Sequence, residues 1–389
     1  MSVRLIVRGR LEGATEPADI TIEDGRVRAI ARTGDGDDGL VVGGRDCLLS
    51  QAFLDIQVNG FATVDFNRTT LKTDELRGAL KAMWRHGVTR FFPTVITASL
   101  QSMQDTLRAI ARAREDDAAL QHAMPGIHLE GPFLAPEDGP RGAHPVTFIQ
   151  NPDWDVFRQL QEASGGLIRM VTLAPERPGA IELISKLQDA GIVVGIGHTD
   201  ASEADIDQAV EAGAQISTHL GNGAHAALPR HRNYIQKQLA TDALMASMIA
   251  DGHHLPSYFI KNFIRCKGLD RVILVTDAMA AAAGPPGTYR LGEVLAEVGP
   301  DGYVRLPGTP YLAGSALTMD RAVENTAEFA GLSLWQAIGL ATGQPRRLFP
   351  SLGAGVATGE PADLVVLREG PPLTVVATIA AGELVYRRP

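Results

Sequence analysis

The sequence predicts an α/β fold: a (β/α)8 TIM barrel with a small β-sandwich domain formed by both chain termini. In the middle of the chain, eight short apolar segments alternate with helical patterns over about 300 residues, which is the repeat of such a barrel. At both ends, short apolar segments alternate instead with glycine and aspartate turns, which favours strands joined by tight connections. We therefore expect a β domain made of residues 1–52 and 353–389, and a barrel at 53–352.

Each barrel strand is expected where apolar and β-branched residues stand between turn signals. In chain order, the expected strands are Phe53–Gln57, Thr89–Thr94, Gly126–Glu130, Ile168–Leu173, Ile192–Gly197, Gln215–His219, Ala246–Asp251 and Val272–Asp277. Helical spacing of apolar residues predicts helices at Leu100–Arg114, Trp154–Ala163, Ile181–Ala190, Ala204–Ala212 and Pro256–Cys266. Residues 285–312 combine glycine, proline and alternating apolar positions, and predict a small β insertion after the last strand.

Composition narrows the classes of function. The chain has 389 residues, of which 45% are hydrophobic, and this is typical of a globular protein. A net charge of −9 argues against a nucleic-acid partner, which would require a basic surface. Met1–Arg4 does not lead into the apolar stretch of a signal peptide, and no apolar run reaches the roughly 18 residues that span a membrane. Cys47 and Cys266 form no disulfide framework or thiolate metal motif. We expect a cytoplasmic protein that acts on a small molecule.

Three metal-capable side chains each follow an apolar strand: Glu130, His198 and His219. The carboxyl ends of barrel strands meet at one mouth, so we expect these side chains to lie close together. One carboxylate and two imidazoles form the donor set of a catalytic divalent metal with one position left open for water. This set suits Zn²⁺, and Fe²⁺ also fits nitrogen and oxygen ligands. The alternative is that all three are ordinary loop residues.

Two further strand ends carry polar groups that face the same mouth. Asp277 ends the eighth strand, where a carboxylate can take a proton from the attacking water and return it to a leaving amine. The alternative role for Asp277 is to cap the following turn. Gln57 and Asn59 end the first strand, and because amides are weak metal ligands we expect them beside the metal water. The alternative is ordinary turn chemistry at Asn59.

Other candidates lie in loops at the mouth. His144 stands in the long connection after the third strand, and we expect either His253 or His254, after the seventh, to contact substrate. The turn Leu312-Ala313-Gly314-Ser315 is predicted to offer backbone N–H groups to a polar substrate group, or else only to cap the next helix. The basic run Arg230–Arg232 either binds an anion or forms a solvated surface.

With these residues in place, the chain resembles the amidohydrolase superfamily and, within it, the N-acetylglucosamine-6-phosphate deacetylases. The resemblance covers nearly the whole chain and rests on the motifs Phe53-Leu54-Asp55-Ile56-Gln57-Val58-Asn59-Gly60, His128-Leu129-Glu130-Gly131-Pro132-Phe133, Gly142-Ala143-His144, Gly197-His198-Thr199, Thr218-His219-Leu220, Ala250-Asp251-Gly252, Val275-Thr276-Asp277-Ala278 and Ala313-Gly314-Ser315. Many members of the superfamily carry a His-x-His pair at the end of the first strand and hold two metals. Gln57 and Asn59 stand there in this chain, so the resemblance implies one divalent ion per chain.

The resemblance implies a homodimer that removes the acetyl group from an amino sugar phosphate, foremost N-acetylglucosamine-6-phosphate. It implies that Glu130, His198 and His219 bind the metal and that Asp277 is the base and acid. His144 would orient the substrate carbonyl. Further substrate contacts would come from Ala143, Asn222, Gly223, His254 and Leu312–Ser315.

Two departures from the family pattern leave the substrate open. After Thr-His-Leu the family usually has an aromatic residue and then Asn-Ala-Met, whereas this chain has Gly221-Asn222-Gly223-Ala224. The family's phosphate-contacting arginine lies in a Gly-Arg-Glu context, for which Arg230 or Arg232 stands here. The alternative substrates are N-acetylgalactosamine-6-phosphate, an unphosphorylated N-acyl sugar or an N-acyl amino acid.

Overall fold

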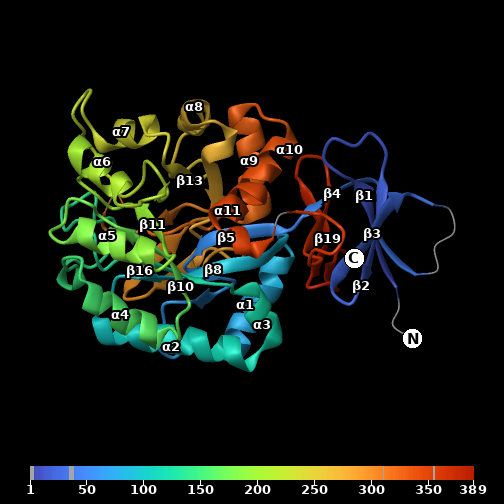
Figure 1. The fold of residues 1–389 in the computed structure, drawn as a ribbon, viewed down its shortest axis with the longest axis horizontal. Coiled ribbons are helices and arrows are strands. Elements are labelled where there is room, and N and C mark those ends of the chain that lie inside the picture. Colours follow the sequence, from blue (N-terminus) through green and yellow to red (C-terminus); the bar gives the residue numbers. More distant parts are fainter. Residues whose placement is uncertain (1–3, 35–38, 310, 354) are drawn as a thin grey trace.

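The computed structural model describes residues 4–34, 39–309, 311–353 and 355–389. Met1–Val3, which entered the expectation about a signal peptide, lie outside the described residues. Figure 1 shows a barrel ringed by helices, and beside it a separate sheet that holds both ends of the chain. The predicted (β/α)8 barrel with a small β domain built from both termini is confirmed.

The small domain is one seven-stranded sheet. In spatial order its strands are β20 (Glu383–Arg387), β19 (Thr374–Ala380), β18 (Leu364–Arg368), β4 (Leu40–Gln51), β1 (Leu5–Arg10), β2 (Ala18–Glu23) and β3 (Arg26–Arg32). The sequence analysis did not identify β4. This strand joins the amino-terminal and carboxyl-terminal parts of the sheet, because it pairs parallel with β1 and antiparallel with β18. A separate apolar core fills this domain, with Val7, Ile20, Leu49 and Val366 fully buried.

Asp363, just before β18, attaches the small sheet to the barrel. Its carboxylate binds Nη2 of Arg90 at 2.8 Å and Nε2 of His122 at 2.7 Å. Burial raises the pKa of Asp363, but the hydrogen bond from His122 and the charges of His122 and Arg90 outweigh burial and lower it. Asp363 therefore has a structural role at the joint and does not line the cavity described below.

Eight parallel strands form the barrel. They are β5 (Phe53–Val58), β8 (Val88–Ile96), β9 (Ile127–Glu130), β10 (Ile168–Leu173), β11 (Val193–Ile196), β12 (Ile216–Ser217), β13 (Met245–Ile249) and β14 (Val272–Val275). Parallel strands covered by helices are buried on both faces, which explains why their sequences are mostly apolar. All eight strands lie at the predicted places, although β12 is only two residues long.

The barrel closes between β14 and β5 through a buried carboxylate. Oδ2 of Asp55 accepts a hydrogen bond from Oγ1 of Thr276 at 2.5 Å, and Oδ1 accepts one from the backbone N–H of Thr276 at 3.2 Å. The N–H of Asp277 then donates to the carbonyl of Gln57 at 3.0 Å. Burial raises the pKa of Asp55 to about 7. This closure brings the polar end of the first strand beside Asp277.

Helices surround the barrel (Figure 1). They are α1 (Thr73–Trp84), α2 (Leu100–Asp116), α3 (Ala118–Ala123), α4 (Trp154–Ala163), α5 (Ala180–Asp189), α6 (Glu203–Glu211), α7 (Tyr234–Ala240), α8 (Ser257–Lys267), α9 (Met319–Ala330), α10 (Leu334–Ala341) and α11 (Gly343–Leu348). Among the described residues, no helix combines the length and apolar character needed to cross a membrane.

The predicted insertion after the last barrel strand is a three-stranded antiparallel sheet. Its strands are β15 (Gly287–Leu291), β16 (Val294–Val298) and β17 (Val304–Arg305). We call residues 287–305 the flap. Asp65 ties the flap to the barrel, because its Oδ2 accepts a hydrogen bond from the N–H of Gly292 at 2.9 Å.

Lys267 ends α8 with its side chain fully buried, and we expect its loss to destabilise the barrel. Its Nζ donates to the carbonyls of Gln238, Thr241 and Leu244 at 2.6, 2.8 and 2.9 Å. Lys267→Met keeps the apolar stem but removes three hydrogen bonds that a buried charged group donates, and it leaves the Leu244 carbonyl without this donor, so the free energy of unfolding should fall by about 3 kcal/mol. Urea denaturation measures this loss. Arg265→Met, on the exposed face of the same helix, is the control, and equal stability of the two variants would contradict the prediction.

Candidate active site

Three of the predicted site residues have strained backbones at the ends of barrel strands. His198, His219 and Asp277 have φ values of 51°, 31° and 48°. The left-handed region is uncommon for residues other than glycine, and such strain persists only where the surroundings hold the residue in place. Strained residues cluster at functional sites, and these three line one cavity.

The three predicted metal ligands meet at that cavity. Nε2 of His219 lies 2.9 Å from Oε1 of Glu130, and Nε2 of His198 lies 3.3 Å from the same oxygen. The two Nε2 atoms are 3.1 Å apart. Ligands about 2.1 Å from a tetrahedral ion stand about 3.4 Å from each other. The spacing of these three donor atoms therefore fits a small divalent ion.

The chemistry of the donors also fits a cation. Nδ1 of His198 donates to the carbonyl of Pro140 at 2.8 Å, which leaves the lone pair of a neutral Nε2 facing the cluster. Burial raises the pKa of Glu130, but its interactions with the neighbouring rings of His198 and His219 outweigh burial and hold the pKa well below its usual value. Gly223 leaves room for the His198 ring, since a Cβ there would lie 2.6 Å from Nδ1. The cluster thus offers one carboxylate and two imidazoles to an ion.

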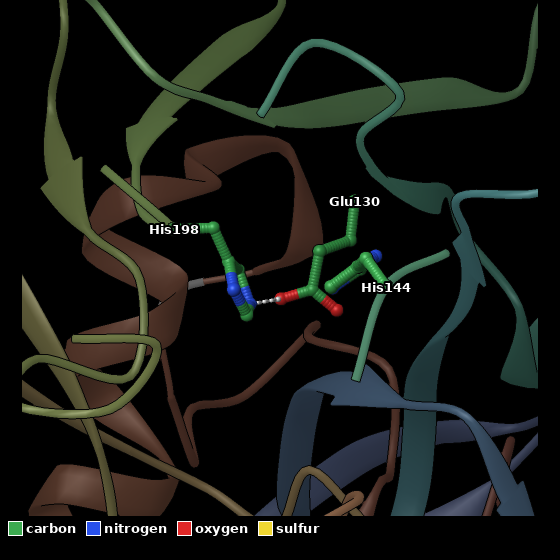
Figure 2. A group of neighbouring side chains, drawn as sticks. All are labelled: Glu130, His144 and His198. Atoms are coloured by element: carbon green, nitrogen blue, oxygen red, sulfur yellow. Dashed lines mark ion pairs between the residues drawn. The ribbon is translucent and has the colours of Figure 1, made fainter. Parts of the chain in front are cut away.

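His144 belongs to the same cluster. Glu130, His144 and His198 each have a possible ligand atom within 4.8 Å of the others, and Figure 2 shows the His144 ring beside the Glu130 carboxylate. Nδ1 of His144 is 3.0 Å from Oγ1 of Thr97, which fixes the ring. Burial, followed by the charge of His198, lowers the pKa of His144 to about 3. A neutral His144 is therefore held in place beside the predicted ligands.

The two strand-one amides contact the acidic groups of the site. Nδ2 of Asn59 donates to Oδ1 of Asp277 at 2.7 Å, and Nε2 of Gln57 donates to Oε1 of Glu130 at 2.9 Å. Asn59 thereby fixes one oxygen of Asp277, while Oδ2 has no partner among the described residues. Burial, followed by the charge of Glu130, raises the pKa of Asp277 to about 6. Asp277 is thus oriented and more basic than an exposed aspartate.

Most of the predicted site residues line one cavity of about 250 Å³. These residues are Asn59, Glu130, Ala143, His144, His198, His219, Asn222, Gly223, His254, Asp277, Leu312, Ala313 and Gly314. The structure thus brings together side chains from strand ends that are up to 218 residues apart, as for Asn59 and Asp277.

Three predicted site residues do not reach the cavity wall. Ser315 is fully buried behind it, where its Oγ donates to the carbonyl of Thr276 and its N–H donates to the carbonyl of Asp277. Gln57 is also fully buried and acts through Glu130. Arg230 is exposed on a loop and does not line the cavity.

Sequence reasoning missed a group of wall residues, most of which lie on the flap or in loops, while Ile96 ends β8. They are Ile96, Gly139, Gly142, Gly221, Ala224, Leu291, Tyr303 and Tyr311. The two tyrosines had a weak signal, since large aromatic residues in a short β insertion beside an active site are candidates for contact with a ligand. The glycines carried no signal that separates a cavity wall from an ordinary turn.

Comparison with known proteins identifies the family. The chain is 31% identical over 388 residues to an N-acetylglucosamine-6-phosphate deacetylase of Lysinibacillus sphaericus, covering 98% of this chain and 97% of that protein. The chain belongs to the N-acetylglucosamine-6-phosphate deacetylase family of the amidohydrolase superfamily. It is also 32% identical to an N-acetylgalactosamine-6-phosphate deacetylase of Escherichia coli O157:H7, covering 92% of this chain and 93% of that protein. No protein-family model matches the sequence.

Solved structures of this deacetylase family share the whole fold. An alanine variant of the Mycobacterium smegmatis N-acetyl-D-glucosamine-6-phosphate deacetylase, in which one aspartate is replaced, was solved with N-acetyl-D-glucosamine-6-phosphate. This chain is similar to it with a TM-score of 0.89 and 31% identity, covering 99% of this chain and 100% of that chain. An enamidase at 14% identity, with a TM-score of 0.61, shares the fold alone. The predicted membership of a metal-dependent amidohydrolase family is confirmed.

Proposed function

We propose that this deacetylase-family chain hydrolyses the N-acetyl amide of N-acetylglucosamine-6-phosphate to glucosamine-6-phosphate and acetate. The observation that carries the proposal is the cavity in which Glu130, His198 and His219 face Asp277. A carboxylate base beside a divalent metal site is an arrangement that supports amide hydrolysis by water. The names of the relatives supply the substrate class.

The proposal assigns one cation to this site. Glu130, His198 and His219 would hold one divalent ion, Zn²⁺ or Fe²⁺, which would polarise the acetyl carbonyl and make a water molecule more acidic. The remaining chemistry belongs to side chains of the chain.

Asp277 moves the proton. Its Oδ1 is held by Asn59, so Oδ2 is the oxygen that accepts a proton from the attacking water. A new C–O bond forms at the acetyl carbon while neutral His144 orients the carbonyl oxygen. As the C–N bond breaks, protonated Asp277 returns the proton to the nitrogen, which leaves as the sugar amine. Water and amide are thereby converted to acetate and amine without any other reactant.

We expect activity to fall on the acid side of the pH profile, because Asp277 must be ionised to act as a base. Its pKa is raised to about 6, so the ionised fraction decreases tenfold per pH unit below that value. A bound cation favours the carboxylate and shifts this limb to lower pH. Initial rates at saturating metal, measured as kcat/KM against pH, test the prediction. A rate that increases towards acid pH would contradict the base role.

A deacetylation screen tests the proposed substrate. We expect N-acetylglucosamine-6-phosphate to be turned over with a higher kcat/KM than N-acetylglucosamine, measured by acetate release on the same preparation. N-Acetylgalactosamine-6-phosphate is the second candidate, since a relative of similar identity is a deacetylase of that sugar. Equal rates with and without the phosphate would favour an unphosphorylated N-acyl sugar. The described wall residues include no lysine or arginine that would identify a phosphate site. The comparison of rates with and without the 6-phosphate therefore decides whether the substrate is phosphorylated.

The proposal includes the cellular setting implied by the family resemblance. We propose a homodimer in the cytoplasm, which takes part in the breakdown of amino sugars. Analytical ultracentrifugation of the purified protein tests the assembly, and a monomer at micromolar concentration would contradict it.

A further inference from the structure

A short turn after β13 places two histidines around one buried carboxylate. The side chain of Asp251 is 9% exposed and that of His254 is 7% exposed. Oδ1 of Asp251 accepts the backbone N–H groups of His253 and His254 at 2.8 and 2.9 Å. Oδ2 lies 2.6 Å from Nδ1 of His254. Both oxygens of the Asp251 carboxylate thus contact groups in the same four-residue segment, Asp251–His254.

These contacts determine which nitrogen of His254 faces the cavity. Burial raises the pKa of Asp251, but the hydrogen bond and charge of His254 outweigh it and lower the pKa, so the carboxylate is ionised. An ionised carboxylate only accepts hydrogen bonds, and therefore Nδ1 of His254 carries the proton. His254 lines the cavity, and its Nε2 has no partner among the described residues. Nε2 is the atom left for a ligand.

The same turn also contacts the flap, which forms another part of the wall. Nε2 of His253 donates to the carbonyl of Asp301 in the flap at 3.1 Å, and its ring meets Tyr303 edge-on, with centroids 5.2 Å apart. Tyr303 lines the cavity with His254. The two histidines that sequence reasoning treated as alternatives therefore have different positions, one at the cavity and one against the flap.

We infer that Asp251 is a positioning residue for substrate binding, which acts by fixing the orientation and the Nδ1–H tautomer of His254. Asp251 is absent from the cavity wall, so it has no contact with substrate of its own. The inference rests on the proposed function only in taking this cavity as the substrate site. An asparagine at this position keeps the size of the side chain, but its amide no longer dictates which nitrogen of His254 carries the proton.

The test combines kinetics with the protonation of His254. Asp251→Asn in the metal-loaded enzyme should raise KM for N-acetylglucosamine-6-phosphate roughly tenfold, the effect of about one hydrogen bond, with kcat within about twofold. In the His254→Ala background the same change should have no further effect. Asp189→Asn, on the exposed end of α5, is the matched control. An unchanged KM, or effects that multiply in the double variant, would overturn the inference.

A second readout needs neither turnover nor a folded variant of Asp251. Nitrogen-15 NMR of histidine-labelled wild-type protein, with the His254 signals assigned by their loss in His254→Ala, reports which ring nitrogen is protonated. We expect a protonated Nδ1, and a neutral ring with the proton on Nε2 would overturn the inference. Absence of deacetylation by the wild type would overturn the proposed function and leave this result standing.

Discussion

Asp277→Asn should lower kcat by about 10²–10⁴-fold, the range that general acid–base groups contribute. The amide keeps the shape of the side chain and can still contact Asn59, but it accepts no proton from water. The same residue returns the proton to the amine, so both halves of the reaction are lost. Acetate release under substrate saturation measures the loss. Because Asp277 is not among the proposed metal ligands, the metal content of the variant should equal that of the wild type.

A control separates loss of the base from a general change in charge at the barrel mouth. Asp200→Asn removes a half-exposed carboxylate outside the cavity and should leave kcat within about twofold, as expected for a surface substitution. An Asp277→Asn enzyme with a full metal complement and near-normal kcat would eliminate Asp277 as the base.

The barrel was predictable because its strands are buried on both faces. Most strands are rich in apolar residues and end at or near a polar residue, and topology alone brings these strand ends together. The same reasoning places Glu130, His198 and His219 at one mouth without any knowledge of their distances. β4 was missed because its 12 residues include two glycines and four charged or polar residues, and its strand character depends on pairing with both β1 and β18.

The less predictable features depend on contacts between distant segments. No local pattern shows that Asn59 would hold Asp277, because that contact depends on closure of the barrel through Asp55 and Thr276. The left-handed backbone of His198 is likewise imposed by its surroundings, since local propensity disfavours it. The glycine turn at 312–315 led to the prediction that Ser315 contacts substrate. In the structure its N–H and hydroxyl instead donate hydrogen bonds to backbone carbonyls of the chain.

His219→Ala should reduce both metal binding and turnover, because it removes one of three proposed ligands. We expect about one divalent ion per chain in the wild type and less than that in the variant. The affinity for Zn²⁺ should fall by more than about 100-fold, since losing a residue that merely supports a ligand already costs 10–100-fold. Metal analysis of purified protein and competition with a chelator measure these quantities, and kcat/KM should fall in parallel.

A control variant and the number of ions per chain decide how the result for His219→Ala is interpreted. His86→Ala removes a histidine that precedes β8, binds Asp320 at 3.0 Å and does not line the cavity. Its metal content should equal that of the wild type. If His219→Ala kept one ion per chain and normal turnover, His219 would not be a ligand. His144 would then be the third ligand, because its possible ligand atom lies within 4.8 Å of those of Glu130 and His198. Two ions per chain in the wild type would instead contradict the prediction of a single metal. That prediction depends on Gln57 and Asn59 standing where other members of the superfamily have the histidines that bind a second ion.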